Sequence, residues 1–349
     1  MLWYLFENQE VVQQLVHISG FSVLAFILGM SLTPVLTDFL YKNSLGKSIR
    51  EHSWDNKESP VYTSHHRHKS GTPTMAGTLF WVTTAILTLL FNLTREETFL
   101  PLFFLTTGGV LGAVDDIANI KGWGTIKGLG AKLKLFLQLL IASFGAYWFS
   151  VKLDWTQLQI PGGELLGIVS EVELGFWYVP LFLLIVLFVM NAVDITDGLD
   201  GLLAGSIIPP FATLTGIAFV QEHYSLAIFL ATLIGALTAF LWFNIHPARF
   251  FMGATGAFAL GSTLAVASFL TDTIVILPII AFLFFVEGFS SLLQTFAKRV
   301  CGRRLLRSAP IHHHFQALGW PESKIVMRFW IISSIASLVG LMIGLVGLS

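Results

Sequence analysis

Long apolar runs alternate with short polar stretches along almost the whole chain. A run of about twenty apolar residues predicts a helix that crosses a membrane, because lipid offers the backbone polar groups no partner outside the segment. The pattern therefore predicts an all-α integral membrane protein with about ten transmembrane helices. These helices are expected at 13–41, 74–93, 99–118, 133–150, 175–192, 202–220, 225–243, 257–271, 274–296 and 328–347.

The composition agrees with a membrane protein. Hydrophobic residues make up 54% of the 349 residues and charged residues only 12%, whereas soluble domains carry about a quarter charged residues. The first residues include Glu7 and Glu10 and lack the basic start of a cleavable signal peptide. The single cysteine, Cys301, excludes an intramolecular disulfide. We expect residues 1–349 to form one polytopic domain.

Positive charge is confined to alternate connectors between the predicted spans. Of the 20 Lys and Arg residues, all except Arg95 and Lys152 lie in, or at the helix tips beside, every second connector. The positive-inside rule then places these connectors in the cytoplasm and both termini on the periplasmic side. The polar candidates for chemistry fall beside the same connectors, so an active site is expected at the cytoplasmic face. The connectors concerned are 42–73, 119–132, 193–201, 244–256 and 297–327.

Two adjacent carboxylates, Asp115 and Asp116, end the apolar run that begins near Leu100, and a basic, glycine-rich loop follows. A carboxylate at the end of a membrane span costs a few kcal/mol, roughly, unless it has water, a cation or a partner. Neighbouring carboxylates also repel each other, which favours one shared proton or a metal ion. The alternative is the start of a loop, with the carboxylates paired to neighbouring lysines.

Three further carboxylates, Asp194, Asp197 and Asp200, lie three residues apart beside Gly198 and Gly201. On a helix this spacing places them on one face, whereas the glycines also allow a tight loop whose N–H groups face a ligand. A simpler alternative is that Asp197 or Asp200 caps the next span. The spacing alone does not separate metal binding from a proton relay.

The C-terminal third of the chain holds further candidates. Three consecutive histidines, 312–314, follow a cluster of arginines, which favours a cationic lobe for phosphate over a zinc site that would need converging ligands. Glu287 and Gln294 share one helix face within an apolar run, where they either pair with each other or line a cavity. The segment 244–256 is either a turn or a loop that cradles phosphate.

The segment that leads into the second predicted span contains Lys69 and Thr74. It is either a helix-entry turn with a threonine cap or a contact for a substrate phosphate.

Taken together, these motifs resemble one family, the phospho-N-acetylmuramoyl-pentapeptide transferases, or bacterial translocase I. This family belongs to the polyprenyl-phosphate N-acetylhexosamine-1-phosphate transferase superfamily. The Asp motifs are shared across the superfamily, whereas the histidine motif points to this branch. The resemblance runs from about residue 60 to residue 330. Its motifs are Lys-x-Gly-Thr-Pro-Thr-Met-x-Gly (69–77), Asp-Asp (115–116), Thr-Asp-Gly-Leu-Asp-Gly (196–201), Asn-x-x-Pro-Ala (244–248), Ala-Pro-Ile-His-His-His-Phe (309–315), Leu-Gly-Trp (318–320) and Arg-Phe-Trp (328–330).

The resemblance implies a membrane enzyme of peptidoglycan synthesis, and hence of cell-wall biogenesis, cell shape and cell division. It would transfer phospho-MurNAc-pentapeptide from UDP-MurNAc-pentapeptide to undecaprenyl phosphate, giving lipid I and UMP. The implied cofactor is Mg²⁺, the implied location is the bacterial inner membrane, and a homodimer is compatible with the family. No nucleic-acid partner is expected.

The resemblance also assigns roles to residues. Asp115 or Asp116 would deprotonate or position the lipid phosphate, Asp197 would organise metal and pyrophosphate, and His312 would join them in catalysis. Asp115, Asp116 and Asp197 would hold the metal. The implied substrate-binding residues are Lys69, Thr74, Asn191, Gly198, Leu199, Asp200, Asn244, Phe251, Glu287, Gln294, His313 and His314.

The chain departs from the family pattern at three positions. Ala254 stands where the family has its magnesium-binding Asp, which puts metal affinity and turnover in question. Asn119 stands where Lys is usual, so a cation beside the Asp pair is absent. Asp194 stands where Asn is usual and adds an anion.

Three rival functions follow from the same residues. A sibling transferase would use UDP-GlcNAc, but the histidine run argues against it. A transporter would use its carboxylates as a proton relay and would show candidates on both faces and inverted repeats, whereas the candidates here cluster on one side. A catalytically impaired homologue that binds substrate or a partner stays open because of Ala254.

Overall fold

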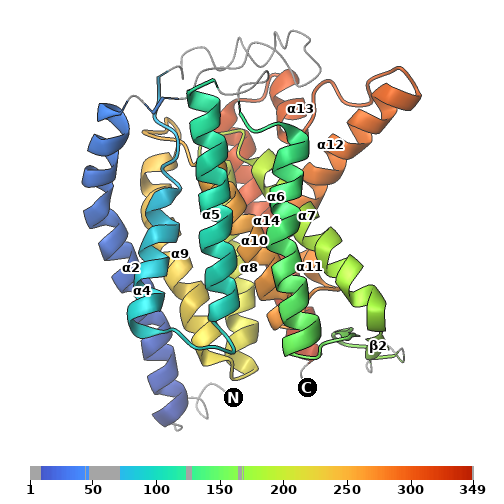
Figure 1. Ribbon diagram of the computed structural model, residues 1–349. Coiled ribbons are helices and arrows are strands. Elements are labelled where there is room, and N and C mark those ends of the chain that lie inside the picture. The colour runs from blue at the N-terminus through green and yellow to red at the C-terminus, as the bar shows by residue number, and fades with distance from the viewer. Residues whose placement is uncertain are drawn as a thin grey trace.

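The computed structural model describes residues 9–43, 45–46, 71–122, 128–163, 167 and 169–347. These residues form a bundle of helices with one small antiparallel hairpin at the end where the C-terminus lies (Figure 1). The helices are α2 (Gln9–Lys42), α4 (Thr78–Phe91), α5 (Phe99–Ile120), α6 (Ala131–Tyr147), η2 (Trp148–Lys152), η4 (Gly175–Trp177), α7 (Tyr178–Thr196), α8 (Leu202–Val220), α9 (Tyr224–Asn244), α10 (Ala254–Leu270), α11 (Leu277–Ile280), α12 (Phe282–Val300), α13 (Ile311–Ala317) and α14 (Glu322–Val346).

The helical membrane class predicted from the apolar pattern is supported. Among the described residues, seven helical segments are long and apolar enough to cross a membrane, and α4 and α10 are shorter apolar helices. The larger number of about ten spans stays a prediction, as does the side on which the termini lie.

One predicted span, 274–296, is divided in the structure. A short helix, α11, ends at Ile280, and Ala281 leaves the helical conformation with φ −104° and ψ 31° before α12 begins. The apolar run continues through this break, so hydropathy alone gives no sign of it. The C-terminal half of α12 then extends away from the bundle (Figure 1).

The hairpin lies in a connector for which the sequence suggested no strand. Its strands, β1 (Gln157–Gln159) and β2 (Glu171–Glu173), pair antiparallel, with Gln157 opposite Glu173. Strands of three residues are too short to give a clear alternation of apolar and polar positions.

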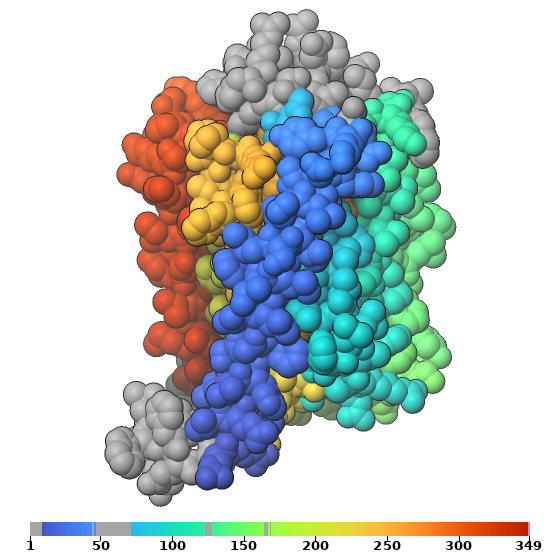
Figure 2. Space-filling view, turned by 90° about the vertical axis from the view of Figure 1, so that its left-hand side faces the viewer, coloured from blue at the N-terminus to red at the C-terminus, as the bar shows by residue number. Residues whose placement is uncertain are grey.

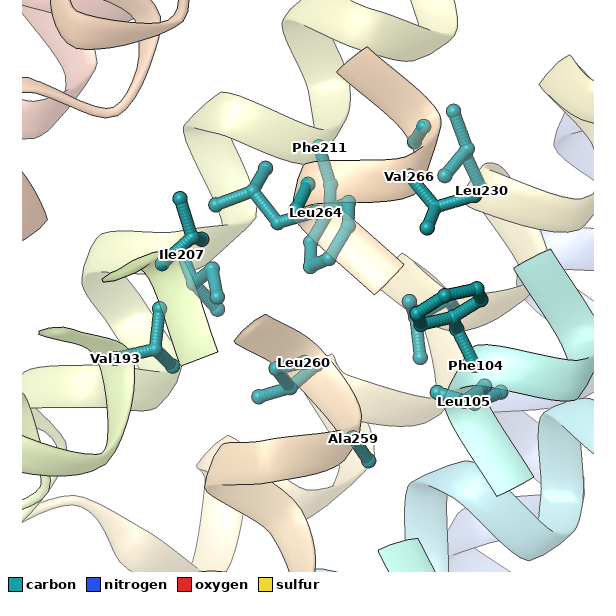
Figure 3. Close-up of a cluster of buried hydrophobic side chains, with 14 of the residues drawn as sticks. Phe104, Leu105, Val193, Ile207, Phe211, Leu230, Ala259, Leu260, Leu264 and Val266 are labelled. Carbon is teal, nitrogen blue, oxygen red and sulfur yellow. The ribbon is translucent and has the colours of Figure 1, made fainter. Parts of the chain in front are cut away.

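Helix α10 lies at the centre of the bundle. Every residue from 255 to 270 is buried, and α10 packs chiefly against α5 and α7. Apolar side chains of α5, α7, α8 and α9 surround it, as Figure 3 shows for Phe104, Val193 and Leu230. Gly261 permits the close approach to α7, because a Cβ there would lie 2.8 Å from the Met190 Cα. The first turn of α10 is therefore held in a fixed position.

Helix α2 forms an outer layer of the bundle. It packs against α9 and α4 and runs along the outside of the molecule in Figure 2. Many of its apolar side chains are exposed, among them Val16, Val23, Ile27 and Val35. Such a surface suits contact with lipid.

Candidate functional site

Carboxylates from two distant motifs converge on the N-terminus of α10. The Asp116 carboxylate, near the end of α5, accepts hydrogen bonds from the N–H groups of Ala254 and Thr255 at 3.2 and 3.0 Å. The Asp197 carboxylate, at the end of α7, accepts one from the Gly253 N–H at 3.3 Å. The N-terminus of a helix carries a partial positive charge and unpaired N–H groups. This end of α10 therefore orients both carboxylates.

Two glycines make this approach possible. A Cβ on Gly112 would overlap the Ala254 carbonyl, so only glycine lets α5 lie this close to the first turn of α10. Gly253 has φ +77° and lies against both the Asp116 carboxylate and the Thr74 hydroxyl. The Thr74 Oγ1 is buried and has no hydrogen-bond partner among the described residues. An unpaired oxygen thus lies beside Asp116.

Asp115 has a different set of partners. Its carboxylate forms a 2.7 Å ion pair with Lys134 of α6 and accepts the Leu129 N–H at 3.0 Å. The Lys134 ammonium also lies 5.2 Å from the centre of the Phe258 ring. Lys134 was not among the predicted site residues, although this lysine lies at a helix tip beside a basic connector. It supplies a cation next to the Asp pair, where Asn119 supplies none.

Of the three carboxylates spaced three residues apart, Asp194 lies in the last turn of α7, whereas Asp197 and Asp200 lie in a loop, 197–201, so the three do not share one helix face. Helix α7 ends at Thr196, and Gly201, with φ +76°, precedes the first residue of α8. The N-cap residue of α8 is Gly201 and neither Asp197 nor Asp200, so the capping alternative is wrong. The loop is fixed by Asn244, which accepts the Gly201 N–H and donates to the Phe250 carbonyl.

Asp200 forms a second cluster with two residues that the sequence analysis missed. Its carboxylate lies 3.0 Å from His246 Nδ1 and accepts the Ala248 N–H, while Glu322 accepts the Asp200 N–H at 2.7 Å. Asp200, His246 and Glu322 each bring a ligand atom within 4.8 Å of the others. His246 belongs to the Asn-x-x-Pro-Ala motif and Glu322 follows a proline at the start of α14, which are the signals that could have pointed to them.

The three carboxylates predicted to hold the metal do not converge on one point in the structure. Among the described residues, Asp200, His246 and Glu322 form the one group of three ligand atoms within 4.8 Å of one another. Asp115, Asp116 and Asp197 do not form such a group. Asp116 and Asp197 share the N-terminus of α10, whereas Asp115 pairs with Lys134.

Glu287 and His312 form a fully buried pair. The Glu287 carboxylate lies 3.0 Å from His312 Nδ1, and both residues are 0% exposed. Glu287 therefore pairs with the histidine, and the alternative pair with Gln294 is not formed. The other ring nitrogen, His312 Nε2, has no hydrogen-bond partner in the described part of the chain and points at Gly198, where a Cβ would overlap it.

Gln294 and the other two histidines have local partners. Gln294 accepts the N–H groups of Leu305 and Leu306, so it fixes the segment after α12. His313 lies 2.6 Å from Gln316, and His314 accepts the Arg307 N–H. The three consecutive rings thus have three different partners, of which only that of His312 lies on α12.

The remaining predicted residues are spread around the same end of the bundle. Asn191 donates to Gln138 Oε1 on α6 at 3.0 Å, a contact that the sequence did not suggest. Leu199 is buried in a small apolar cluster that includes residues of α12 and α14. The Phe251 backbone pairs with Pro73 and Ala76, next to Thr74. Lys69 lies outside the described residues.

The chain is similar to known proteins over nearly its whole length. A sequence model of Glycosyl transferase family 4 matches residues 98–272. A phospho-N-acetylmuramoyl-pentapeptide-transferase of a Geobacillus species is 36% identical over 325 residues, which cover 92% of this chain and 96% of the relative. Proteins of the same name from Chloroflexus aggregans and Bacillus subtilis are each 35% identical, covering 96% and 92% of this chain and 92% and 96% of the relatives. The chain therefore belongs to the phospho-N-acetylmuramoyl-pentapeptide transferase family.

Proposed function

We propose that this protein transfers phospho-MurNAc-pentapeptide from its UDP carrier to undecaprenyl phosphate, giving lipid I and UMP. The observation that carries the proposal is the meeting of Asp116 and Asp197 at the N-terminus of α10, in a chain that belongs to this family. The loop 197–201 joins this point to His312 through Gly198 and to His246 through Asp200. Most of the predicted site residues thus lie around one loop.

In the proposed reaction, an oxygen of undecaprenyl phosphate attacks the phosphorus that bears the sugar. A new P–O bond forms, the bond to the UMP oxygen breaks, and UMP leaves with the electron pair. Such a transfer depends on positioning and on neutralising phosphate charge. Lys134 would place a cation for the anionic acceptor at the end of α5, where its ammonium also forms a 2.7 Å ion pair with the Asp115 carboxylate. Asp115 or Asp116 would take or direct the acceptor's proton.

The residues beside α10 fit a magnesium ion. Mg²⁺ is usually bound by one or two carboxylates together with substrate phosphates, and Asp116 and Asp197 provide two carboxylates. The unpartnered Thr74 Oγ1 adds a third oxygen at the same place, whereas Ala254 contributes none. When bound there, the ion would neutralise charge on the pyrophosphate. Asp200, His246 and Glu322 are a second group of suitable ligands.

Glu287 would act as a positioning residue. Its bond to Nδ1 fixes the orientation of the His312 ring, so that Nε2 is directed at the loop containing Asp197 and Gly198. A buried carboxylate with only one partner costs free energy. The direction of His312 Nε2 toward this loop therefore supports a role for the ring orientation.

We also propose that the site faces the cytoplasm of a bacterial inner membrane. The donor is water-soluble and the acceptor is embedded in lipid, so the reaction needs an interface. The positive charge in alternate connectors supports this orientation. A homodimer stays a prediction.

The test is a reconstituted assay in detergent with UDP-MurNAc-pentapeptide and undecaprenyl phosphate, with and without Mg²⁺. Lipid I and UMP should form in equal amounts, and only with the ion. UDP-GlcNAc as donor tests the sibling activity. Transfer of GlcNAc-1-phosphate alone would overturn the proposed donor.

A second candidate, a homologue that binds the nucleotide but turns over slowly, is favoured by Ala254. Uridine-nucleotide binding and turnover measured on one sample distinguish the two. Binding without turnover would support this candidate, and turnover would exclude it.

A further inference from the structure

A cavity of about 550 Å³ lies at the end of the bundle opposite the site described above. It is enclosed by the ends of α8, α10 and α14 and by the hairpin β1–β2, which lies at the same end as the C-terminus in Figure 1. Its volume falls within the range of small-molecule sites. None of the residues assigned to the transferase reaction lines it, so the reaction does not explain it.

Three polar side chains that line this cavity, those of Gln221, Thr271 and Thr273, offer hydrogen-bond acceptors. Gln221 donates through Nε2 to the Thr271 carbonyl, which leaves its Oε1 buried without a partner among the described residues. The Thr271 hydroxyl donates to the Ala267 carbonyl, and the Thr273 hydroxyl lies 2.9 Å from Thr271 Oγ1. The hydroxyl hydrogens are thus engaged within the protein, and the oxygens of these two cavity-lining residues can still accept hydrogen bonds.

The charge of the cavity is negative. Asp272 and Glu171 are among its lining residues, and no Lys, Arg or His is found among the described residues that line it. The Asp272 carboxylate is partly buried and has no hydrogen bond or ion pair with another described residue. His223 acts on it electrostatically, but this ring pairs with Glu97 at 3.7 Å and does not line the cavity. A partly buried carboxylate without a hydrogen-bond partner is costly. A ligand that brings positive charge and hydrogen-bond donors would remove that cost.

We propose that this cavity binds a primary ammonium group, with Asp272 as its counter-ion and Gln221 Oε1 and the threonine oxygens as its hydrogen-bond acceptors. Ile160, Ile217 and Val346 line the same cavity and would cover the carbon part of the ligand. The amine has two possible sources, the headgroup of an aminophospholipid such as phosphatidylethanolamine and a soluble amine. The chemistry that binds either one is the same.

The test measures thermal unfolding of the full chain in detergent, after removal of bound lipid. Ethanolamine and 1,4-diaminobutane should raise the unfolding midpoint with increasing concentration, because they bind only the folded state. Tetramethylammonium, which has charge but no N–H donor, and neutral N-acetylglucosamine should not. An equal rise with either control compound would overturn the proposal.

Two arms identify the source of the amine. Phosphatidylethanolamine is compared with phosphatidylcholine in mixed micelles, and with free ethanolamine. Stabilisation by phosphatidylethanolamine at a concentration at least about tenfold lower than that of free ethanolamine assigns the site to a lipid headgroup. Stabilisation by both at similar concentrations assigns it to the ammonium group alone. Stabilisation by neither contradicts the proposal.

Substitution provides the matched control. Asp272 has φ +52°, a conformation that Asn tolerates, so Asp272→Asn should fold and lose about tenfold in amine affinity, the usual loss for a charged hydrogen bond. Glu171→Gln, on the exposed hairpin, should lose less. Asp154→Asn changes an exposed acid with the similar φ of +55° outside the cavity and should bind as the parent does. Unchanged binding by Asp272→Asn would exclude this site, and lipid I formation plays no part in that result.

Discussion

At one end of the bundle, the carboxylates of Asp115, Asp116 and Asp197 are all engaged by N–H groups or by an ammonium. At the other end, the Asp272 carboxylate faces a cavity and bonds to no other described residue. Both ends place acids next to apolar helices. The difference is that the first end pairs its carboxylates directly with positive charge, from the N-terminus of α10 and from Lys134, whereas no cation among the described residues contacts the Asp272 carboxylate and His223 acts on it from farther away.

This difference has a consequence for chemistry. Carboxylates held by backbone N–H groups keep one orientation, which phosphoryl transfer requires. A carboxylate that lacks such partners is free to accept a ligand but is not fixed for catalysis. The following experiments test this contrast, beginning with the largest expected effect.

Replacing Asp116 by Asn should reduce lipid I formation by about a hundredfold or more, as expected for a group that moves or directs a proton. The amide keeps the size of the side chain but loses its charge. The exchange of labelled UMP into UDP-MurNAc-pentapeptide measures the step directly. Glu173→Gln, on the hairpin at the opposite end, is the matched control and should exchange at the parental rate. Retained exchange in Asp116→Asn would exclude Asp116 from the reaction.

Introducing a carboxylate at the first turn of α10, Ala254→Asp, should raise Mg²⁺-dependent turnover by about tenfold, corresponding to roughly 1.4 kcal/mol of transition-state stabilisation. A negative group is also favoured at a helix N-terminus. Ala254→Asn separates charge from size and should gain little. If Ala254→Asp turns over no faster than the parent, then the metal lies elsewhere, and the Asp200, His246 and Glu322 group is the next candidate.

Glu287→Gln should lower kcat by about fivefold to tenfold with little change in KM, an effect of the size expected for loss of one oriented group. The reason is that the His312 ring loses the partner on Nδ1 that directs Nε2 at Gly198. A purely structural role would instead lower the melting temperature and leave both constants unchanged in the folded fraction. Glu287→Asp, which keeps the charge, should restore part of kcat.

The smallest effect on activity, and a distinct effect on stability, is expected at Asp272. Burial raises the pKa of its carboxyl from 3.8 to about 6. The folded state therefore holds this proton more tightly than the unfolded state does. The resulting stability is fully present below pH 4 and is lost as the pH rises through 6, by up to about 3 kcal/mol.

The variant Asp272→Asn has no carboxyl group at this position, so its stability does not depend on this titration. The unfolding free energy of the parent, minus that of Asp272→Asn, should therefore fall as the pH rises from 4 to 7. Lipid I formation should change little. Chemical denaturation across this pH range measures it. A pH-independent difference would mean that Asp272 has ordinary access to water, which would also weaken the contrast between the two ends.

The sequence was informative about the class of fold and about which polar residues matter. Apolar runs predicted the positions of most helices, because a membrane helix must satisfy its own backbone. The break at Ala281 and the three-residue strands were missed, since neither changes the apolar pattern. Local composition does not determine where a helix breaks or changes direction, because that depends on packing against neighbouring helices.

The sequence predicted which residues belong to the site, but it did not predict how they contact one another in space. The sequence suggested that Asp116 and Asp197 lie at the same face, but their shared partner, the N-terminus of α10, depends on contacts across more than fifty residues. Lys134, His246 and Glu322 were missed for the same reason. Glu287 was expected either to pair with Gln294 on its own helix or to line a cavity, and it pairs with His312 of α13.

The enclosure of α10 has a consequence for how the protein adapts to its surroundings. Since protein covers every residue from 255 to 270, no lipid touches this helix. A change in bilayer thickness or lipid species therefore acts first on outer elements such as α2, which can tilt or exchange side chains without disturbing the axis.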